Sequence, residues 1–397
     1  MPHASRPLAV ASLILTSFAL ILALPAAHVA WSDSVVATVA AGPGPTLAAI
    51  DPHNGEIYVT DSGSIAAPGN TVTAIQASTA SVVANITVGS YPAGVAYDPL
   101  NDEVYVANAG SDTVSVINGS TDEVVENITV GSYPTGVTYD SSNGDIYVAD
   151  SASGAVSVID GSTNAVITTV AVGSLPTLLA FDPANGEVYV ANTESNVVSV
   201  IDGSTNEMVA DVAVRSGPGG LAFDSANGDV YITNAGSLTA AGSTVSVVDG
   251  ATNSVVADIA VGSYPAGVAY DPLNDEVYVA NHGSNSVSVI DGSTNKVVSN
   301  VTVGSGPVGV AFDPTDGEIY VVNYASNTIS VIAPSPVVAS STGTGSTSAT
   351  TTAGVPTKSG PPSVTFGPET YLEIGVAIEI GVAAAVIALR RGRPPRG

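Results

Sequence analysis

The sequence predicts an all-β protein, a seven-bladed β-propeller with four antiparallel strands in each blade. The pattern Tyr-(Val/Ile)-X-(Asn/Asp) occurs seven times, at spacings of 42 or 47 residues. A period near 40 residues is typical of propeller blades. Between the patterns, short runs rich in Val, Ile and Ala alternate with turns rich in Gly, Asp, Asn and Pro, as expected for strands. The patterns begin at Tyr58, Tyr105, Tyr147, Tyr189, Tyr231, Tyr278 and Tyr320.

The second repeat shows how one blade is built. Its strands are expected at residues 94–97, 103–107, 113–117 and 124–130. The turn after the first strand is Asp-Pro-Leu-Asn-Asp at residues 98–102, and other repeats have Asp-Pro-X-Asn-Gly there. Proline sets φ, Asx side chains bond nearby backbone and glycine accepts positive φ, so this turn is typical of a hairpin.

The last repeat stops at Ile332, before a fourth strand. The missing strand has a counterpart at the front of the chain, because residues 35–40 match residues 82–88 and 297–303. We therefore expect the N-terminal strand to close the ring as the outer strand of the last blade. Closure of this kind removes the free strand edges of an open array.

The flanks predict export and membrane attachment. Residues 1–30 contain an apolar run after Arg6 and read as a signal peptide, with its removal left open. Residues 31–333 form the propeller, and residues 334–370 form a Ser/Thr/Pro-rich stalk. Residues 371–389 are apolar enough for a transmembrane helix, although Glu373 and Glu379 weaken that interpretation.

The basic segment 390–397, with four arginines, is expected in the cytoplasm. These features predict a single-pass protein of the cell membrane with its propeller on the outside. Whether the C-terminal helix is retained or removed is left open.

Charge and composition exclude several classes of protein. The propeller has 32 acidic residues against Arg215 and Lys296, within a chain of net charge -27. Such a surface repels phosphate, so nucleic acid is excluded as a partner. The chain has no cysteine, which excludes disulfides, thiolate metal sites and a cysteine nucleophile. Solubility at high salt would explain the acidity as well as a cation-rich exterior would.

The two 47-residue spacings come from loops that are five residues longer, at residues 61–70 and 234–243. They fall in the first and fifth blades, nearly opposite each other, on the top face of the ring. Repeat proteins often bind partners on the face that accepts insertions. Residues 88–108 and 261–281 are identical, however, so the paired loops also fit an internal duplication. The candidate binding residues are Ser64, Ile65, Asn70, Leu238, Thr239 and Ser243.

Few residues offer catalytic chemistry. His53 lies in a bottom-face turn and His282 in a top-face loop, so they are not expected to share a site, and each is interpreted as a solvated loop residue. An aspartate ends each inner strand, and the seven would form a ring suited to a hard cation such as calcium. The alternative is that each bonds the backbone of its own turn. The ring is Asp51, Asp98, Asp140, Asp182, Asp224, Asp271 and Asp313.

The repeats also contain aromatic residues at regular positions and several glycosylation sequons. The motif tyrosines and the inner-strand aromatics are expected to pack blade against blade rather than to form a carbohydrate platform. Asn-X-Ser/Thr sequons become candidates for glycosylation because export is predicted. They begin at Asn85, Asn118, Asn127 and Asn300.

The repeats contain Tyr58-Val59-Thr60-Asp61 and Tyr231-Ile232-Thr233-Asn234, and in other repeats Pro-X-Gly-Val-Ala-(Tyr/Phe)-Asp-Pro precedes the pattern. These motifs resemble the YVTN-repeat β-propeller family over about three quarters of the chain. That family includes archaeal surface-layer and cell-surface proteins. The resemblance implies a glycosylated, surface-layer-like binding or scaffold protein without enzymatic activity or cofactor. Its expected partners are envelope proteins or glycans. The alternative is a metal-dependent, lactonase-like hydrolase or lyase, although the chain has no catalytic set matching such enzymes.

Overall fold

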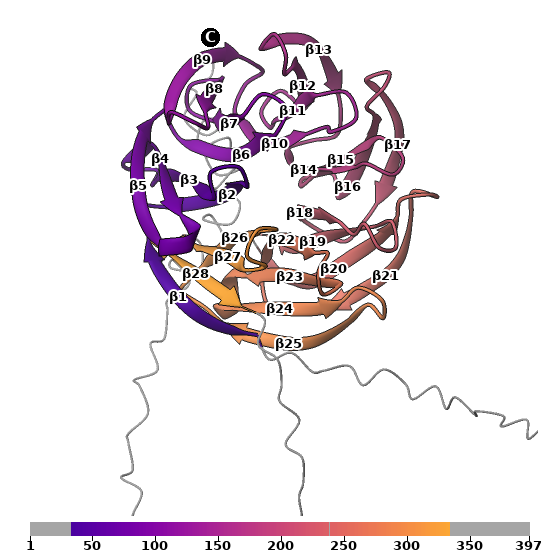
Figure 1. Cartoon of the computed structure of the whole chain (residues 1–397). Coiled ribbons are helices and arrows are strands. Elements are labelled where there is room, and N and C mark those ends of the chain that lie inside the picture. The colour runs from indigo at the N-terminus through magenta and orange to yellow at the C-terminus, as the bar shows by residue number, and fades with distance from the viewer. Residues whose placement is uncertain (1–32, 238, 334–397) are drawn as a thin grey trace, which may run out of the picture.

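Seven four-stranded antiparallel sheets surround one axis in the computed structural model, which describes residues 33–237 and 239–333 (Figure 1). Blades one to six each use four consecutive strands, from the axis outward. The predicted seven-bladed propeller is therefore confirmed. In the described ranges, no helix is long and apolar enough to cross a membrane. The predicted leader, stalk, transmembrane helix and basic tail lie outside the described residues.

The two inner strands of each blade carry the repeat pattern. The innermost strands are β2 (Pro45–Asp51), β6 (Pro92–Asp98), β10 (Pro134–Tyr139), β14 (Pro176–Asp182), β18 (Pro218–Phe223), β22 (Pro265–Asp271) and β26 (Pro307–Phe312). The second strands are β3 (Glu56–Gly63), β7 (Glu103–Asn108), β11 (Asp145–Asp150), β15 (Glu187–Asn192), β19 (Asp229–Ser237), β23 (Glu276–Asn281) and β27 (Ile319–Asn323). Every innermost strand begins at a proline, whose missing N–H suits the start of a strand.

The outer half of each blade follows. The third strands are β4 (Pro68–Gln76), β8 (Thr113–Asn118), β12 (Ala155–Asp160), β16 (Val197–Asp202), β20 (Ala240–Asp249), β24 (Ser286–Asp291) and β28 (Thr328–Ala333). The outermost strands are β5 (Ser81–Thr87), β9 (Glu123–Thr129), β13 (Ala165–Ala171), β17 (Glu207–Ala213), β21 (Ser254–Ala260), β25 (Lys296–Thr302) and β1 (Ser34–Ala40). Two short 3-10 helices, η1 (Ala77–Thr79) and η2 (His282–Ser284), occur in turns.

Blade seven is closed by the N-terminal strand. Its order from the outside inward is β1, β28, β27 and β26. Strand β1 pairs antiparallel with β28, from Ser34 opposite Ala333 to Ala40 opposite Thr328. The predicted seam is confirmed, and it ties the two ends of the propeller together.

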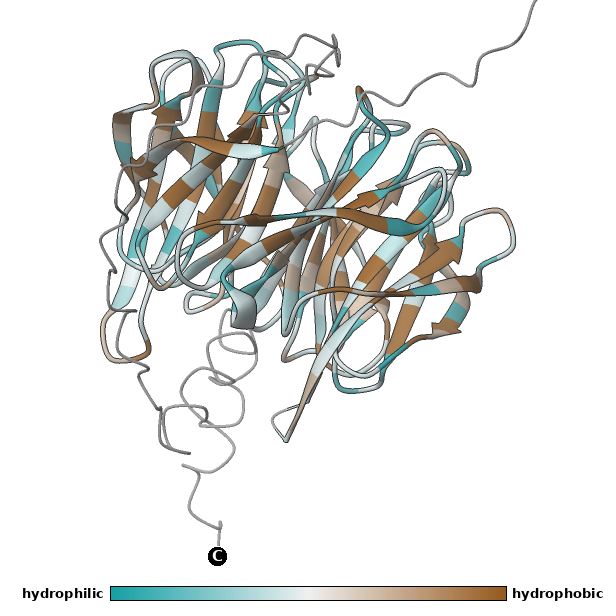
Figure 2. Cartoon of the chain, turned by 90° about the horizontal axis from the view of Figure 1, so that it is seen from below, coloured by the Kyte–Doolittle hydropathy of each residue, from teal (hydrophilic) through white to brown (hydrophobic). Residues whose placement is uncertain are grey.

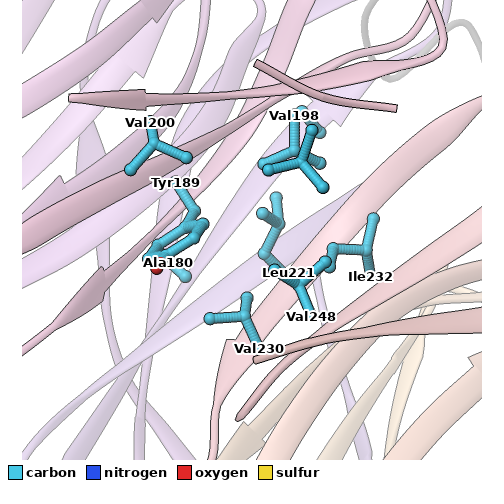
Figure 3. Packing of buried hydrophobic residues seen from close by; sticks show 10 residues of the cluster. Ala180, Tyr189, Val198, Val200, Leu221, Val230, Ile232 and Val248 are labelled. Carbon is cyan, nitrogen blue, oxygen red and sulfur yellow. The ribbon is translucent and has the colours of Figure 1, made fainter. Parts of the chain in front are cut away.

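The hydrophobic core is divided into seven clusters, one between each pair of neighbouring blades. Between blades four and five, Tyr189 and Val198 pack in one cluster with Leu221 (Figure 3). Successive strand residues point to opposite faces, so Tyr58 packs toward blade two while Ile57 packs toward blade seven. Figure 2 shows the resulting alternation of hydrophobic and hydrophilic residues along the strands.

The motif tyrosines also bond one blade to the next. Tyr147 is fully buried, and its hydroxyl lies 2.7 Å from Asn206 Oδ1 and 3.3 Å from Gly203 O in the outer turn of blade four. Tyr58, Tyr105, Tyr189 and Tyr231 make equivalent contacts. These side chains act in blade-to-blade packing, as the spacing predicts.

Candidate functional site: the top face and a bottom-face cluster

The two insertions extend hairpins rather than forming irregular loops. Strands β3 and β4 remain paired out to Gly63 and Pro68, and β19 and β20 out to Ser237 and Ala240. The first tip is closed by two backbone hydrogen bonds between Ser64 and Ala67, of 3.0 and 3.1 Å. The hairpins belong to blades one and five, on opposite sides of the ring (Figure 1). We call them the hairpin walls.

The candidate binding residues of the hairpin walls are accessible to a partner. Ile65 is 56% exposed, and Ser64, Asn70, Thr239 and Ser243 are exposed too. Leu238 lies outside the described residues. The structure does not bring the two sets of residues together, because they belong to walls on opposite sides of the ring.

A residue with a left-handed backbone conformation precedes the proline of every innermost strand. All seven residues there have positive φ, between 50 and 66°. Glycine adopts this conformation at little cost, but bulky residues do so rarely and with strain. The residues are Gly44, Tyr91, Tyr133, Leu175, Gly217, Tyr264 and Gly306. Four blades therefore hold a large side chain where the other three have glycine.

The preceding blade holds this position in place. The Tyr133 backbone N–H donates to Asp112 Oδ1 at 2.8 Å. In the blades that follow a hairpin wall, a wall carbonyl replaces that side chain: Tyr91 N–H donates to Gly69 O, and Tyr264 N–H to Gly242 O. The walls thus help to position the tyrosines. Sequence reasoning missed these residues, although the alternation of tyrosine and glycine at one repeat position was a visible signal.

We define the aromatic collar as Tyr91, Tyr133, Tyr264, His282 and Tyr324, together with the apolar Leu175 at the equivalent position of blade four. Tyr91, Tyr133, Leu175 and His282 are buried, and Tyr264 and Tyr324 are half-buried. The Tyr91 and Tyr133 ring centroids are 6.5 Å apart, and the Tyr324 hydroxyl donates to Gly63 O in the first wall at 3.2 Å. The Tyr133 hydroxyl has no hydrogen-bond partner within the described ranges, and burial raises the pKa of Tyr133 to about 12. Its O–H therefore remains protonated at neutral pH.

His282 is buried, so its interpretation as a solvated residue is wrong. Only 6% of it is exposed, and its Nδ1 has no hydrogen-bond partner in the part of the chain that is described. Burial lowers the pKa of His282 to about 4, so the ring is neutral at pH 7. Gly306 leaves room for it, because a Cβ there would lie 3.2 Å from His282 Nε2. Packing against the next blade, which one repeat does not reveal, causes this burial.

The ring of seven aspartates is present, but the side chains serve their own turns. In every case Oδ1 accepts the backbone N–H two residues onward, at 2.7 to 2.8 Å. The aspartates are almost completely buried. Oδ2 of several of them points toward the glycine of the outer turn in the next blade, as Asp140 does toward Gly203. This geometry is the turn-capping alternative, and the seven carboxylates do not converge on a shared cation position.

One cluster on the bottom face mixes imidazole and carboxylate groups. Donor atoms of Asp51, His53 and Asp102 all lie within 4.8 Å of one another, and they are the one such group of three among the described residues. His53 Nδ1 is 3.7 Å from Asp51 Oδ1 and 4.0 Å from Asp102 Oδ1. The Tyr97 hydroxyl hydrogen-bonds with His53 Nδ1 and donates to Asp102 Oδ1 at 3.0 Å. Sequence reasoning missed the cluster because its members come from two blades.

Three of the four sequon asparagines lie on outermost strands. Asn85, Asn127 and Asn300 are exposed, and each Oδ1 accepts a hydroxyl hydrogen bond from the third strand of its blade. Nδ2, the atom to which a glycan attaches, takes no part in these three bonds. Asn118 is half-buried at the end of β8. The outer surface thus leaves three sequons accessible.

Comparisons with known proteins agree with the fold. Residues 132–159, in blade three, match the model of the NHL repeat. No curated protein matches the chain. Among solved structures, the chain is similar to hydrazine synthase of Kuenenia stuttgartiensis, with 21% identity and a TM-score of 0.66 over 74% of this chain and 96% of that one. At this identity the likeness is one of fold. The chain is a repeat β-propeller in which one blade matches the NHL repeat.

Proposed function

We propose that this protein is a membrane-anchored cell-surface propeller that binds envelope proteins or glycans through its top face and acts as a scaffold rather than as an enzyme. The observation that carries the proposal is the combination of two exposed hairpin walls with the aromatic collar. Export and membrane attachment rest on the sequence of the two ends of the chain.

The strained tyrosines support a binding role. A bulky residue at positive φ costs of order 1 kcal/mol or more, and such strain clusters at functional sites. Glycine fills the same position in blades one, five and seven, so the backbone conformation there does not require an aromatic side chain. Tyrosine combines a flat apolar ring with a hydroxyl, which suits both protein surfaces and sugar rings.

Binding is tested with the full chain displayed on cells, by crosslinking followed by mass spectrometry, and with the purified full chain on isolated envelope glycans. Tyr91→Gly and Tyr133→Gly remove collar side chains while keeping the backbone conformation that glycine favours. Both side chains are only 7% exposed, so each change should also lower the melting temperature, and binding is compared below that temperature. We expect each folded variant to lower affinity by about tenfold or more, the effect of losing an aromatic anchor.

The matched control is Leu100→Ser on the bottom face. Leu100 is 72% exposed and, like Ile65, is an apolar residue in a turn. Ile65→Ser should weaken capture of partners, whereas Leu100→Ser should not. Equal effects of the two changes, or unchanged capture by both collar variants, would contradict binding through the top face.

A further inference from the structure

The geometry points to a second site on the opposite face: we propose that Asp51, His53 and Asp102 bind one divalent transition-metal ion of the zinc class between blades one and two. This site is independent of the binding proposed for the top face. It also differs from a calcium ring at the axis, because it uses one histidine and two aspartates from neighbouring turns.

The spacing of the donor atoms fits a small ion. Two ligands of a tetrahedral zinc ion with bonds of about 2.1 Å are about 3.4 Å apart. His53 Nδ1 lies 3.7 and 4.0 Å from the nearest oxygens of Asp51 and Asp102. Small side-chain rotations would therefore bring all three donors to bonding distance. The Tyr97 hydroxyl hydrogen-bonds with His53 Nδ1 and donates to Asp102 Oδ1, so ion binding would require Nδ1 to be unprotonated and Tyr97 to leave it.

The cluster also contains a buried carboxylate oxygen without a partner in the described part of the chain, a feature that Asp140, Asp224 and Asp313 share. Asp51 is 0% exposed, and its Oδ2 has no hydrogen-bond partner within the described residues. A Cβ placed on Gly119 would lie 2.8 Å from Asp51 Oδ2 and 2.8 Å from Asp102 Oδ1. The two oxygens therefore both lie close to Gly119, and a side chain at residue 119 would crowd them. A buried carboxylate oxygen without a donor is stabilised by a cation.

The duplicated half of the ring contains a near copy that lacks only the histidine. Between blades five and six, Tyr270 donates to Asp275 Oδ1 at 3.2 Å, and a Cβ on Gly292 would lie 2.7 Å from Asp224 Oδ2 and 2.6 Å from Asp275 Oδ1. Ala226 takes the place of His53 there. The molecule therefore provides its own control for the contribution of the imidazole.

Donor chemistry and exposure define the class of ion. Imidazole nitrogen favours zinc, nickel and copper over calcium and magnesium, and carboxylates complete the site. The His53 side chain is 61% exposed and that of Asp102 31% exposed, whereas Asp51 is buried. Three protein ligands with an exposed outer side leave a position for water or for a donor from a partner, as in open zinc sites.

The test uses the purified full chain, freed of metal with a chelator and equilibrated with Zn²⁺ or Co²⁺. Excess Mg²⁺ suppresses diffuse binding to the acidic surface. We expect one ion per chain and visible Co²⁺ absorption bands. His53→Ala should weaken binding at least about tenfold, since losing even a supporting group of a metal site costs that much. Asp102→Gly should do the same, and glycine suits the φ of 58° at this residue.

The near copy gives the reciprocal experiment. A226H in the His53→Ala background should restore one tightly bound ion, because Ala226 is exposed in a turn of the same conformation. Equal affinity of the unmodified chain and His53→Ala, or no stoichiometric ion in the unmodified chain, would overturn the proposal. If a folded A226H variant binds no ion, one histidine and two aspartates in this arrangement are not sufficient to form the site.

Discussion

The interface between blades four and five and the interface between blades six and seven have the same packing but different polar partners. At the first, Tyr189 meets the outer turn of blade five, with its hydroxyl 2.8 Å from Asn253 Oδ1 and 3.3 Å from Gly250 O. At the second, the ends of the propeller replace that turn. There the Tyr278 hydroxyl lies 3.3 Å from Asp33 Oδ1, just before β1.

This replacement changes the electrostatics. The Asn253 amide donates to Glu187 Oε2 at 3.1 Å, so a neutral donor faces the carboxylate. At the seam, Asp33 and Glu276 both face the Tyr278 hydroxyl, and neither supplies a donor when ionised. Burial, with added repulsion from Asp271, raises the pKa of Asp33 to about 6. Burial, with added repulsion from Asp33 and Asp271, raises the pKa of Glu276 to about 7. Because a separate strand closes the ring, the seam contains two carboxyl groups that bind protons more tightly than usual.

Removing the closing strand should have the largest effect. Deletion of residues 31–41 exposes the edge of β28 and removes Val39, which is 6% exposed, from the cluster between blades seven and one. Two or three buried side chains are worth about 1.5 to 3 kcal/mol each. We expect the free energy of unfolding to fall by about 5 kcal/mol or more, measured by thermal and urea denaturation. An equal deletion within the predicted stalk is the control, and an unchanged melting temperature would refute closure by β1.

The acidic seam should give a measurable pH dependence. A carboxyl whose folded pKa is raised binds protons more tightly in the folded state, so its contribution to stability is complete below the unfolded pKa, near 4, and is lost as pH rises through 6 to 7. Asp33→Asn imitates the amide at the regular interfaces. We expect it to raise the melting temperature at pH 7.5 by a few degrees and to change it little at pH 4.

The matched control for Asp33→Asn is Asp160→Asn, on an exposed turn where hydrogen bonds from Ser162 lower the pKa of the aspartate. That change should be neutral or destabilising at pH 7.5, because it removes an ionised acceptor. A gain at pH 7.5 in both variants would indicate relief of overall negative charge rather than a property of the seam.

Removing one motif hydroxyl at a regular interface should lower the free energy of unfolding by less than the seam deletion does, but by a measurable amount. Tyr189→Phe removes a hydroxyl that is fully buried and close to two groups of the next blade. Gly250 O keeps a hydrogen bond from Asn185 Nδ2 at 3.0 Å, but Asn253 Oδ1 loses this donor. Leaving an acceptor without a donor costs about 1 to 3 kcal/mol. We expect a loss in that range by urea denaturation with an unchanged m-value, and Tyr147→Phe should reproduce it. A loss below about 0.5 kcal/mol in both would mean that the rings alone stabilise the interface.

The regular part of the fold could be predicted because its causes are local. The tyrosine spacing gave the blades, and the match of residues 35–40 to other outermost strands gave the seam. The Asp-Pro turn gave the hydrogen bond from the His53 N–H to Asp51 Oδ1. Each of these features depends on residues within one repeat or on the comparison of repeats.

The candidate sites depend on contacts between blades, which a single repeat does not contain. Asp102 reaches His53 only because the inner turn of blade one lies against blade two. His282 is buried only because blade seven packs over it, and its neighbour there is the small residue Gly306. Such side-chain environments depend on how neighbouring blades pack against each other. The burial of His282 and the spacing of the donor atoms around His53 could therefore be seen only in the folded ring.

The smallest loss of stability is expected at the interface between blades seven and one. There the motif tyrosine is Tyr320, whose hydroxyl contacts differ most from those of Tyr189. The Tyr320 hydroxyl lies 3.2 Å from Asp316 Oδ2 and 3.3 Å from Glu318 Oε2, and both acceptors belong to its own blade. Asp316 is exposed, so water can replace the lost donor. We expect Tyr320→Phe to cost less than about 0.5 kcal/mol, the low end for a hydrogen bond at an accessible site. If its cost in urea denaturation equals that of Tyr189→Phe, contacts to the next blade do not explain the effect of the motif hydroxyls.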